Sequence, residues 1–334
     1  MPPARDLVLL VTHSADHYTV DRVAEELSER GVRALRINSD GFPAELSLTS
    51  SLDGEGGEVL LRTPAGEGVR AAEVRSVWLR RMVPPRLDAS LDPAYIDSCV
   101  RESKAALEGA MDGLEAAGCR FVNRLEADRV ASNKLRQLRV AREVGLEVPR
   151  TLVTNDAARV RSFFEQVRGH LVAKMLTPLT WSMSGGQPFV YTSAIGPEHL
   201  EELEEGLRFS PMVFQERIAK ARELLVAVVG GRCLVGAIDA SGSSAGQVDW
   251  RRARPDECRW TKGELPRDVA ARLVRLMSAL GLVYGAVDFI VTPEGRHVFL
   301  EVNPGGEWGM LERELGLPIA AALADALVSG GGSP

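Results

Sequence analysis

The chain has few aromatic residues, few lysines and no long hydrophobic run. Aromatic residues make up 5% of its 334 residues, and of the 40 basic residues 35 are Arg and five are Lys. The first apolar run, Leu7 to Thr12, is about six residues long, too short for the core of a signal peptide or for a membrane span. We therefore expect a cytoplasmic protein with no membrane partner.

Cysteine pairs and excess positive charge are also missing. The chain has four widely separated cysteines, namely Cys99, Cys119, Cys233 and Cys258. Because none forms a Cys-x-x-Cys pair, the sequence indicates neither a zinc site nor a disulfide framework. The net charge of -6 argues against a broad nucleic-acid surface, so we expect no nucleic-acid partner.

What remains is the composition of an ordinary globular protein with room for two or three domains. The apolar run Leu7–Thr12 is typical of a strand buried on both faces. Apolar residues at helical spacing from Val20 to Leu27, Gly31 and the run Ala34–Ile37 follow, which predicts a βαβ unit. Further predicted strands flank residues 53–57 and include Val77–Leu79, and a long helix is expected over 93–117.

From about residue 125 the pattern changes to helices and strands of mixed order. It includes a helix from Pro197 to Glu205 ended by Gly206, a strand pair turning at Gly230-Gly231, and a last hairpin turning at residues 292–295. The sequence therefore predicts an α+β protein in three parts. Their expected bounds are 1–124, 125–210 and 211–334.

The last predicted hairpin carries three side chains with oxygen donors. Glu301 and Asn303 are two residues apart on one strand and so face the same side, and the turn brings Asp288 beside them. Acids within apolar runs are costly without a partner, and Mg²⁺ is the cation that best suits this donor set. From spacing alone, a solvated edge hairpin, or pairing of Asp288 with a buried Arg, is an equal alternative.

Lys174 lies in a strand, Leu171–Leu176, that otherwise reads as buried. In a chain that prefers Arg, this residue is typical of a point charge directed at a phosphate. The Gly/Ser-rich loop that follows, residues 177–188, has small residues that let backbone amides approach an anion. By itself the loop fits an ordinary surface loop, and its place after Lys174 favours the phosphate hypothesis.

The strand that ends at Gln215, Glu216 and Ile218 is followed by Glu223. Backbone groups at such a strand end are able to bind adenine, and Glu223 is placed to accept from ribose hydroxyls. From this segment alone, two adjoining strands with ordinary surface charge are the better explanation.

In this order, the motifs resemble the ATP-grasp superfamily across residues 125 to 306. They are Asn133-Lys134, Lys174, the Gly/Ser loop, Gln215-Glu216-x-Ile218, Arg222-Glu223-Leu224, Asp288 and Glu301-x-Asn303-Pro304. The resemblance implies ATP as cosubstrate, an ATP-grasp fold and an N-terminal pre-ATP-grasp domain. It implies that Lys134 and Lys174 contact phosphates, the Gln215 to Ile218 segment adenine and Glu223 ribose, and that Asp288, Glu301 and Asn303 hold two Mg²⁺ ions.

One position departs from this pattern. Many relatives have an Arg two residues before the metal-binding Asp, where this chain has Ala286. We expect Arg251 to steady the acyl phosphate instead, with Arg232 as a second candidate. Arg251 is also explained as one member of a solvated basic run, Arg251 to Arg254.

The whole chain is most similar to the macrocyclases of graspetide biosynthesis. The motifs that carry the resemblance are Arg36 to Pro43, Val77 to Arg81, Asp249-Trp250-Arg251 and Glu301 to Trp308. It implies a homodimeric ligase that phosphorylates Asp or Glu side chains of a ribosomal precursor peptide and closes ω-ester rings with Thr or Ser. It also implies that a leader segment binds near Phe189 to Tyr191 and the adjoining Glu-rich helix.

Esterification requires a base for the hydroxyl nucleophile. Asp239 and Asp249 are the candidates, and for each a turn or salt-bridge role is an equal alternative. Two other functions stay open at this point. One is an ATP-grasp ligase that joins an amino acid or amine to a peptide or small acid, and the other is a nucleotide-binding module without activity.

Overall fold

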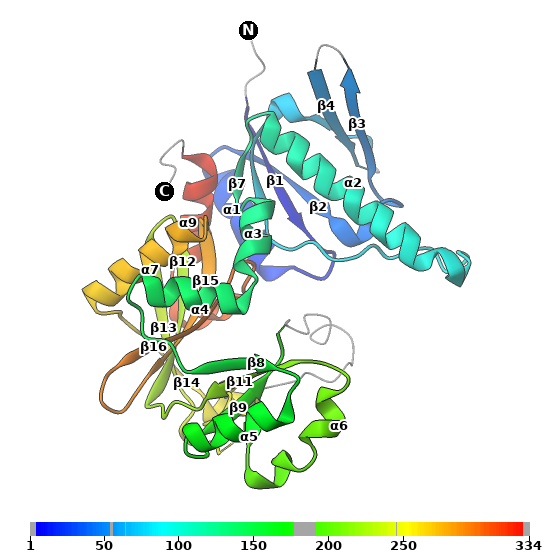
Figure 1. Ribbon diagram of the computed structural model, residues 1–334. Helices are drawn as coiled ribbons and strands as arrows, with labels where there is room; N and C mark the ends of the chain where they lie inside the picture. The colour runs from blue at the N-terminus through cyan, green and yellow to red at the C-terminus, as the bar shows by residue number, and fades with distance from the viewer. Residues whose placement is uncertain (1–4, 54–55, 64, 177–191, 245, 330–334) are drawn as a thin grey trace.

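The first part of the chain forms a parallel sheet. The computed structural model describes residues 5–53, 56–63, 65–176, 192–244 and 246–329 (Figure 1). In the sheet, four parallel strands pair in the order β2-β1-β6-β7. They are β1 (Leu7–Thr12), β2 (Arg33–Asn38), β6 (Val74–Leu79) and β7 (Arg120–Val122).

Helices cover both faces of this sheet, so β1 is buried along its whole length. Leu7, Leu9 and Val11 pack in one core with α2 (Ile96–Ala116). Val8 and Leu10 pack in another with α1 (Tyr18–Glu29) and α9 (Ile319–Val328). The continuous apolar run of β1 is explained by these two cores. The last helix of the chain thus completes the core of the first sheet (Figure 1).

A small antiparallel sheet extends the core beneath α2. Its strands are β3 (Ser47–Asp53), β4 (Gly56–Arg62) and β5 (Gly68–Arg70). Val59, Leu61 and Val69 from this sheet pack in the same cluster as Leu107 and Met111 of α2. The chain then continues through α3 (Leu125–Ala131) and α4 (Lys134–Glu143) toward the second part.

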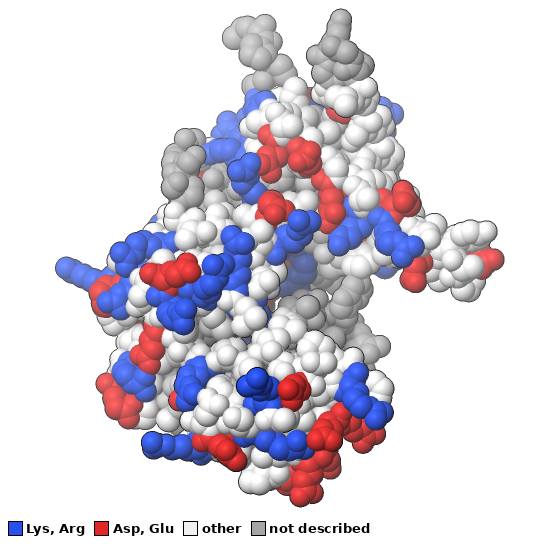
Figure 2. Space-filling model, in the orientation of Figure 1, with Lys and Arg blue, Asp and Glu red and all other residues white. Residues whose placement is uncertain are grey.

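The central part is a four-stranded antiparallel sheet with helices on one face. Its order is β10-β9-β11-β8, and its core includes Val160 and Phe163 of α5 and Phe214 of β11. The elements are β8 (Thr151–Thr154), α5 (Ala157–Gln166), β9 (Leu171–Lys174), β10 (Ser193–Ile195), α6 (Leu203–Leu207) and β11 (Met212–Glu216). Figure 2 shows acidic side chains gathered at the lower edge of the molecule, around α6.

The last part is a five-stranded antiparallel sheet in the order β14-β13-β12-β15-β16. One face packs against α4 and α7. The elements are β12 (Arg222–Val229), β13 (Arg232–Asp239), β14 (Arg259–Lys262), α7 (Arg267–Ala279), β15 (Tyr284–Val291), β16 (His297–Asn303) and α8 (Gly309–Leu315). Short 3-10 turns lie at Ser39–Gly41, Ala71–Glu73, Pro93–Tyr95, Pro197–Leu200, Trp250–Arg252 and Pro255–Glu257.

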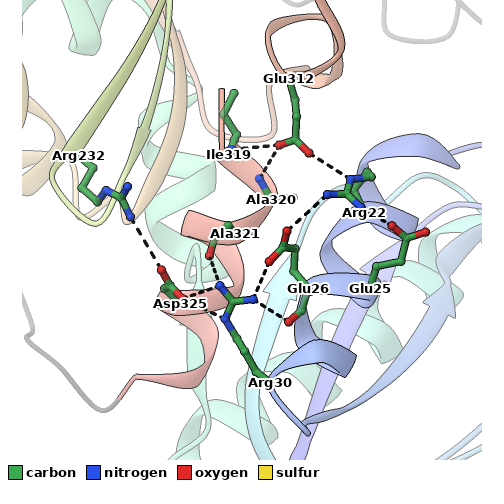
Figure 3. A network of polar contacts seen from close by, with 10 residues as sticks. All are labelled: Arg22, Glu25, Glu26, Arg30, Arg232, Glu312, Ile319, Ala320, Ala321 and Asp325. Atoms are coloured by element: carbon green, nitrogen blue, oxygen red, sulfur yellow. Dashed lines mark hydrogen bonds and ion pairs between the residues drawn. The ribbon is translucent and has the colours of Figure 1, made fainter. Parts of the chain in front are cut away.

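A polar network joins α1 to the C-terminal helices (Figure 3). Arg22 contacts Glu312 of α8 at 3.2 Å, and the other oxygen of Glu312 accepts from the first backbone amides of α9, Ile319 and Ala320. Arg30 contacts Asp325 of α9 at 2.8 Å. Together with the apolar core between α1 and α9, these contacts fix the end of the chain on the first sheet.

The predicted elements and the observed ones agree closely for the βαβ unit and the last hairpin. The predicted helix from Pro197 to Glu205 is wrong, because the segment forms a 3-10 turn and the short α6, and Gly206 lies inside α6. The exposed glutamates of this segment, which repel one another, disfavour a single longer helix. Not predicted were α3, α8, β5, β7, β10 and β14. No helix in the described part of the chain is long and apolar enough to span a membrane.

Candidate active site

A cavity of about 1110 Å³ lies where the three large parts of the chain meet. Its wall includes residues after β6 and from α2, the start of α4, strands β9 and β11, and one face of the β12-β15-β16 sheet. This volume exceeds the usual range of roughly 300–1,000 Å³ for a small-molecule site. It is large enough for a nucleotide and part of a second substrate.

The strand alternation of β12, β15 and β16 explains why acids gather on the cavity wall. Asp288 pairs in register with Glu301, and Ala286 pairs with Asn303. These side chains face the cavity, while alternate residues such as Val287 and Phe289 are fully buried in the core beneath α4 and α7. Placing the apolar set in the core therefore forces the polar set into the cavity.

The electrostatics of the two acids differ. Burial, with Glu301 and Glu223 nearby, raises the pKa of Asp288 to about 7, although Arg251 works in the opposite direction. Burial also acts to raise the pKa of Glu301, but Lys134 and Lys174 outweigh it and lower that pKa to about 2. Lys134 Nζ donates to Glu301 Oε2 at 2.8 Å, and Asn303 Nδ2 donates to Oε1 at 3.3 Å. The neighbouring cations therefore stabilise the charged form of Glu301, but they do not fully stabilise that of Asp288.

This donor set fits Mg²⁺. Asp288, Glu301 and Asn303 offer two carboxylates and an amide oxygen, and Mg²⁺ takes one or two carboxylates and completes its shell with water and phosphate. No group of three or more His, Cys, Asp or Glu side chains suited to a metal was found in the described part of the chain. The raised pKa of Asp288 shows that its charged form is disfavoured, and a divalent cation bound beside it would stabilise that form.

Lys174 enters the same cavity from the central sheet. Its Nζ donates to Gln215 Oε1 at 2.9 Å, and Gln215 Nε2 donates to Thr151 Oγ1 at 3.0 Å. Burial lowers the pKa of Lys174, and the attraction of Glu301 only partly offsets this. The side chain of Gln215 therefore orients the lysine. An anion brought next to Lys174 would stabilise its charged form.

The predicted nucleotide-binding residues lie along one side of the cavity. Glu216, Ile218 and Glu223 all line it. Lys220 Nζ donates to Glu223 Oε1 at 2.5 Å, while burial raises the pKa of Glu223 despite this contact. The Gly/Ser loop 177–188 and the predicted leader-binding residues 189–191 lie outside the described residues.

Arg251 lies in the cavity wall between two acids. It contacts Asp249 at 3.5 Å and Asp288 at 3.4 Å, and Asp288 and Asp249 raise its pKa even though burial acts to lower it. Arg251 is thus both paired with two acids and exposed to solvent, with 38% of its side chain accessible, so its role stays a prediction. Arg232, the second candidate, contacts Asp325 on α9, and it does not belong to the cavity wall.

Of the two acids predicted as a base, only Asp249 lines the cavity. It is buried, and Oδ2 accepts from the backbone amide of Thr192 at 3.3 Å. Asp239 lies exposed at the end of β13, outside the cavity wall, where the backbone amide of Ser241 donates to it. Hydrogen bonding by the Ser241 side chain, and then by this backbone amide, lowers the pKa of Asp239. Its position favours the alternative turn role.

A turn that follows Asn303 is held by side chains to which the sequence assigned no role. Its three consecutive carbonyls accept from buried donors: Pro304 O from Asn123 Nδ2, Gly305 O from Arg80 Nη1, and Gly306 O from the Tyr284 hydroxyl. A Cβ at position 305 would lie 2.8 Å from Arg80 O, and one at position 306 would overlap Ala286. Only glycines fit this turn.

The sequence contains an indirect indication that Arg80 and Asn123 belong to the site. Arg80 and Asn123 directly follow the parallel strands β6 and β7. In open parallel sheets the carboxyl ends of the strands form the edge where ligands bind. Polar residues immediately after a buried strand are therefore candidates for a site.

We expect Asn123→Ala to destabilise the protein strongly. The Asn123 side chain also accepts from the backbone amides of Val283 and Tyr284, at 2.8 and 2.9 Å. Its loss leaves several buried backbone groups unpaired, which we expect to cost about 3 kcal/mol or more. Thermal unfolding measures this. Asn133→Ala, which removes the exposed N-cap of α4, is the matched control and costs about 1 kcal/mol. Equal losses in the two variants would contradict the prediction.

Comparisons with known proteins agree with this geometry. Residues 7–129 match the family model of the MvdD pre-ATP grasp domain. The macrocyclase MdnB from Microcystis aeruginosa MRC is 45% identical, with a TM-score of 0.83 over 97% of this chain and 100% of that chain. MdnC of the same organism, solved with its precursor peptide MdnA, is 31% identical, with a TM-score of 0.85 over 96% of this chain and 99% of that one.

A more distant neighbour is a RiPP-associated ATP-grasp ligase from Chryseobacterium gregarium, solved with ADP and a leader and core peptide. It is 28% identical, with a TM-score of 0.88 over 98% of both chains. A search of curated protein sequences finds no match. The 45% identity to MdnB, over nearly the whole length of both chains, establishes the family of this protein. The chain is an ATP-grasp ligase and belongs to the family of graspetide macrocyclases.

Proposed function

We propose that this ligase uses ATP to phosphorylate Asp or Glu side chains of a ribosomal precursor peptide and closes ω-ester rings with Thr or Ser hydroxyls, releasing ADP and phosphate. The observation that carries the proposal is the convergence of Asp288, Glu301, Lys134, Lys174 and Arg251 on one cavity larger than a nucleotide needs. A carboxylate is a poor electrophile, so it must be activated before a hydroxyl attacks it.

ATP with Mg²⁺ would supply the phosphoryl group and neutralise its charge. We assign the holding of two Mg²⁺ ions to Asp288, Glu301 and Asn303, and phosphate contact to Lys134 and Lys174. The segment from Gln215 through Glu216 to Ile218 would bind adenine and Glu223 would bind ribose. Solved neighbours carry ADP, and one of them, PsnB, carries Mg as well.

Arg251 is our candidate for steadying the acyl phosphate, because it lies between Asp249 and Asp288 at the cavity wall. Asp249 is the better placed of the two acids proposed as the base for the attacking hydroxyl, since Asp239 lies outside the wall. Proton removal by a positioned carboxylate is worth typically 10²- to 10⁴-fold in rate.

A precursor peptide with a leader segment is the proposed second substrate. MdnC was solved with its precursor peptide MdnA. In this chain five exposed glutamates on and before α6 form the acidic edge seen in Figure 2, which would favour a partly basic leader. They are Glu198, Glu201, Glu202, Glu204 and Glu205.

We also propose the division into a pre-ATP-grasp domain of residues 1–124 and two ATP-grasp subdomains, 125–210 and 211–334. We further propose that the protein is a homodimer and that it is located in the cytoplasm. Size-exclusion chromatography with light scattering tests the dimer.

The proposed reaction is tested by the intact mass of a candidate precursor after incubation with the protein, ATP and Mg²⁺. We expect the loss of one water for each ring, matched ADP release, and reversal by mild base as for an ester. Unchanged peptide mass with ADP formed on other acceptors would leave an ATP-grasp ligase of another substrate class. Loss of water that resists mild base would indicate an amide.

A further inference from the structure

Arg81 is a partly buried cation at the cavity wall, with a single side-chain contact among the described residues. It directly follows β6 and lines the cavity beside Met82, Val83 and Pro84. Its Nη2 donates to Gly305 O at 3.2 Å, and this is the one side-chain contact found for it among the described residues. No carboxylate of the described residues lies within ion-pair distance of it. Burial, and then the adjacent Arg80, lower the pKa of Arg81.

The two nearest acids are already occupied. Asp16 accepts from the hydroxyls of Thr12 and Thr19 at 2.6 and 3.0 Å, and lies 3.6 Å from Arg80. Glu307 accepts from Arg80 Nη2 at 2.7 Å and from the backbone amides of Trp308 and Gly309. Arg80 thus contacts both acids and is fully buried, whereas Asp16 and Glu307 attract Arg81 only at longer range, without an ion-pair contact.

The contact of Arg81 with the turn does not by itself explain the residue. Arg80 already donates to the same carbonyl, Gly305 O. A second guanidinium there adds the cost of a buried charge next to a like charge, which an unpaired site does not recover. The placement becomes favourable when an anion enters the cavity and pairs with the free donors of Arg81.

We propose that Arg81 binds the side-chain carboxylate of the peptide that the enzyme activates. A guanidinium presents a planar fork that matches a carboxylate with two parallel hydrogen bonds. Gly305, which Arg81 touches, is two residues after Asn303, so the carboxylate would lie at the metal end of the cavity. The apolar residues Met82 to Pro84 would pack against the methylene groups of the same side chain.

This inference rests on the proposed function, since it names the group that is to be phosphorylated. The first test therefore avoids catalysis and uses a defined probe, N-acetyl-glutamic acid α-methylamide, with its glutamine isostere as the uncharged control. Binding is measured by saturation-transfer NMR with Mg²⁺ and ADP present. Arg81→Gln keeps a donor for Gly305 O and removes the charge, and Arg81→Lys keeps the charge without the fork.

We expect wild-type protein to bind the acid probe about 10- to 100-fold more tightly than the isostere, as a charge-assisted bidentate contact allows. Arg81→Gln should abolish this preference, Arg81→Lys should keep part of it, and ADP affinity should not change. Arg101→Gln, an exposed change on α2 outside the cavity wall, is the matched control and should bind as wild type does.

Two outcomes overturn the inference: no preference for the acid probe in wild-type protein, or an unchanged preference in Arg81→Gln with a wild-type melting temperature. The mass assay separates this failure from that of the proposed function. If wild-type protein forms rings and Arg81→Gln still prefers the acid probe over its isostere, only the proposed carboxylate subsite is rejected. An Arg81-dependent preference without ring formation on any precursor keeps the subsite and rejects the ester macrocyclisation.

Discussion

Changing Asp288 to Asn is expected to lower the ATP-dependent rate of ADP release by roughly 10³-fold or more and to leave the fold intact. The carboxylate is largely buried beside Glu301, and burial raises its pKa to about 7. If Asp288 holds Mg²⁺ as we propose, its loss forfeits several kcal/mol of charge stabilisation, and each 1.4 kcal/mol is about tenfold in rate. Rates are measured at several Mg²⁺ concentrations, because weaker metal binding also raises the Mg²⁺ concentration required.

The matched control is Asp239→Asn, which makes the same chemical change outside the cavity wall, on strand β13 of the same sheet, two strands away from β15. We expect it to keep at least half of the wild-type rate. A small effect in Asp288→Asn, or a large one in Asp239→Asn, would place the catalytic metal elsewhere. Because Asn is nearly isosteric with Asp and removes a buried charge, Asp288→Asn should melt no lower than wild type.

Changing Lys174 to Met acts in opposite directions on activity and stability. ATP-dependent turnover should fall by roughly 10²-fold or more, because a positioned charge on the transferring phosphate is lost. Stability without nucleotide should rise slightly, because Met has a similar volume and no buried charge, while the loss of the donor to Gln215 Oε1 offsets part of this gain. Burial lowers the pKa of Lys174, so at pH values below the ordinary pKa of lysine its burial reduces the stability of the folded state.

Melting temperature and ADP release, measured on the same preparations, test this pair of effects. Lys262→Met, on the exposed edge strand β14, is the control and should leave both nearly unchanged. A variant that loses both activity and stability would show Lys174 to be a structural residue bound to Gln215. A stabilised variant with normal turnover would exclude it from phosphate binding.

The acid and lysine positions could be predicted because strand periodicity is local information. Asp288, Glu301 and Asn303 share a face through a period of two and one tight turn, both visible in the sequence. Lys174 was marked by a single charge in an apolar strand. The same reasoning could not separate Asp239 from Asp249, since that difference depends on where β13 ends relative to the cavity.

The contribution of the first sheet to the site could not be predicted in the same way. Arg80, Arg81 and Asn123 reach the turn at residues 304–306 only after separations of more than 180 residues. Such contacts depend on how two sheets dock, and no local pattern encodes docking. Placement of α9 against β1 is of the same kind, because its apolar faces indicate burial but not the partner.

The packing of α9 on the first sheet affects how such ligases can be recombined. Trp308, Leu323 and Leu327 belong to one core with Val8 and Trp78, and Arg22 and Arg30 bind the C-terminal helices (Figure 3). A chimera that exchanged only the first 124 residues with a relative would combine mismatched halves of that core. The exchangeable unit is discontinuous, and a working hybrid must carry α8 and α9 along with the N-terminal segment.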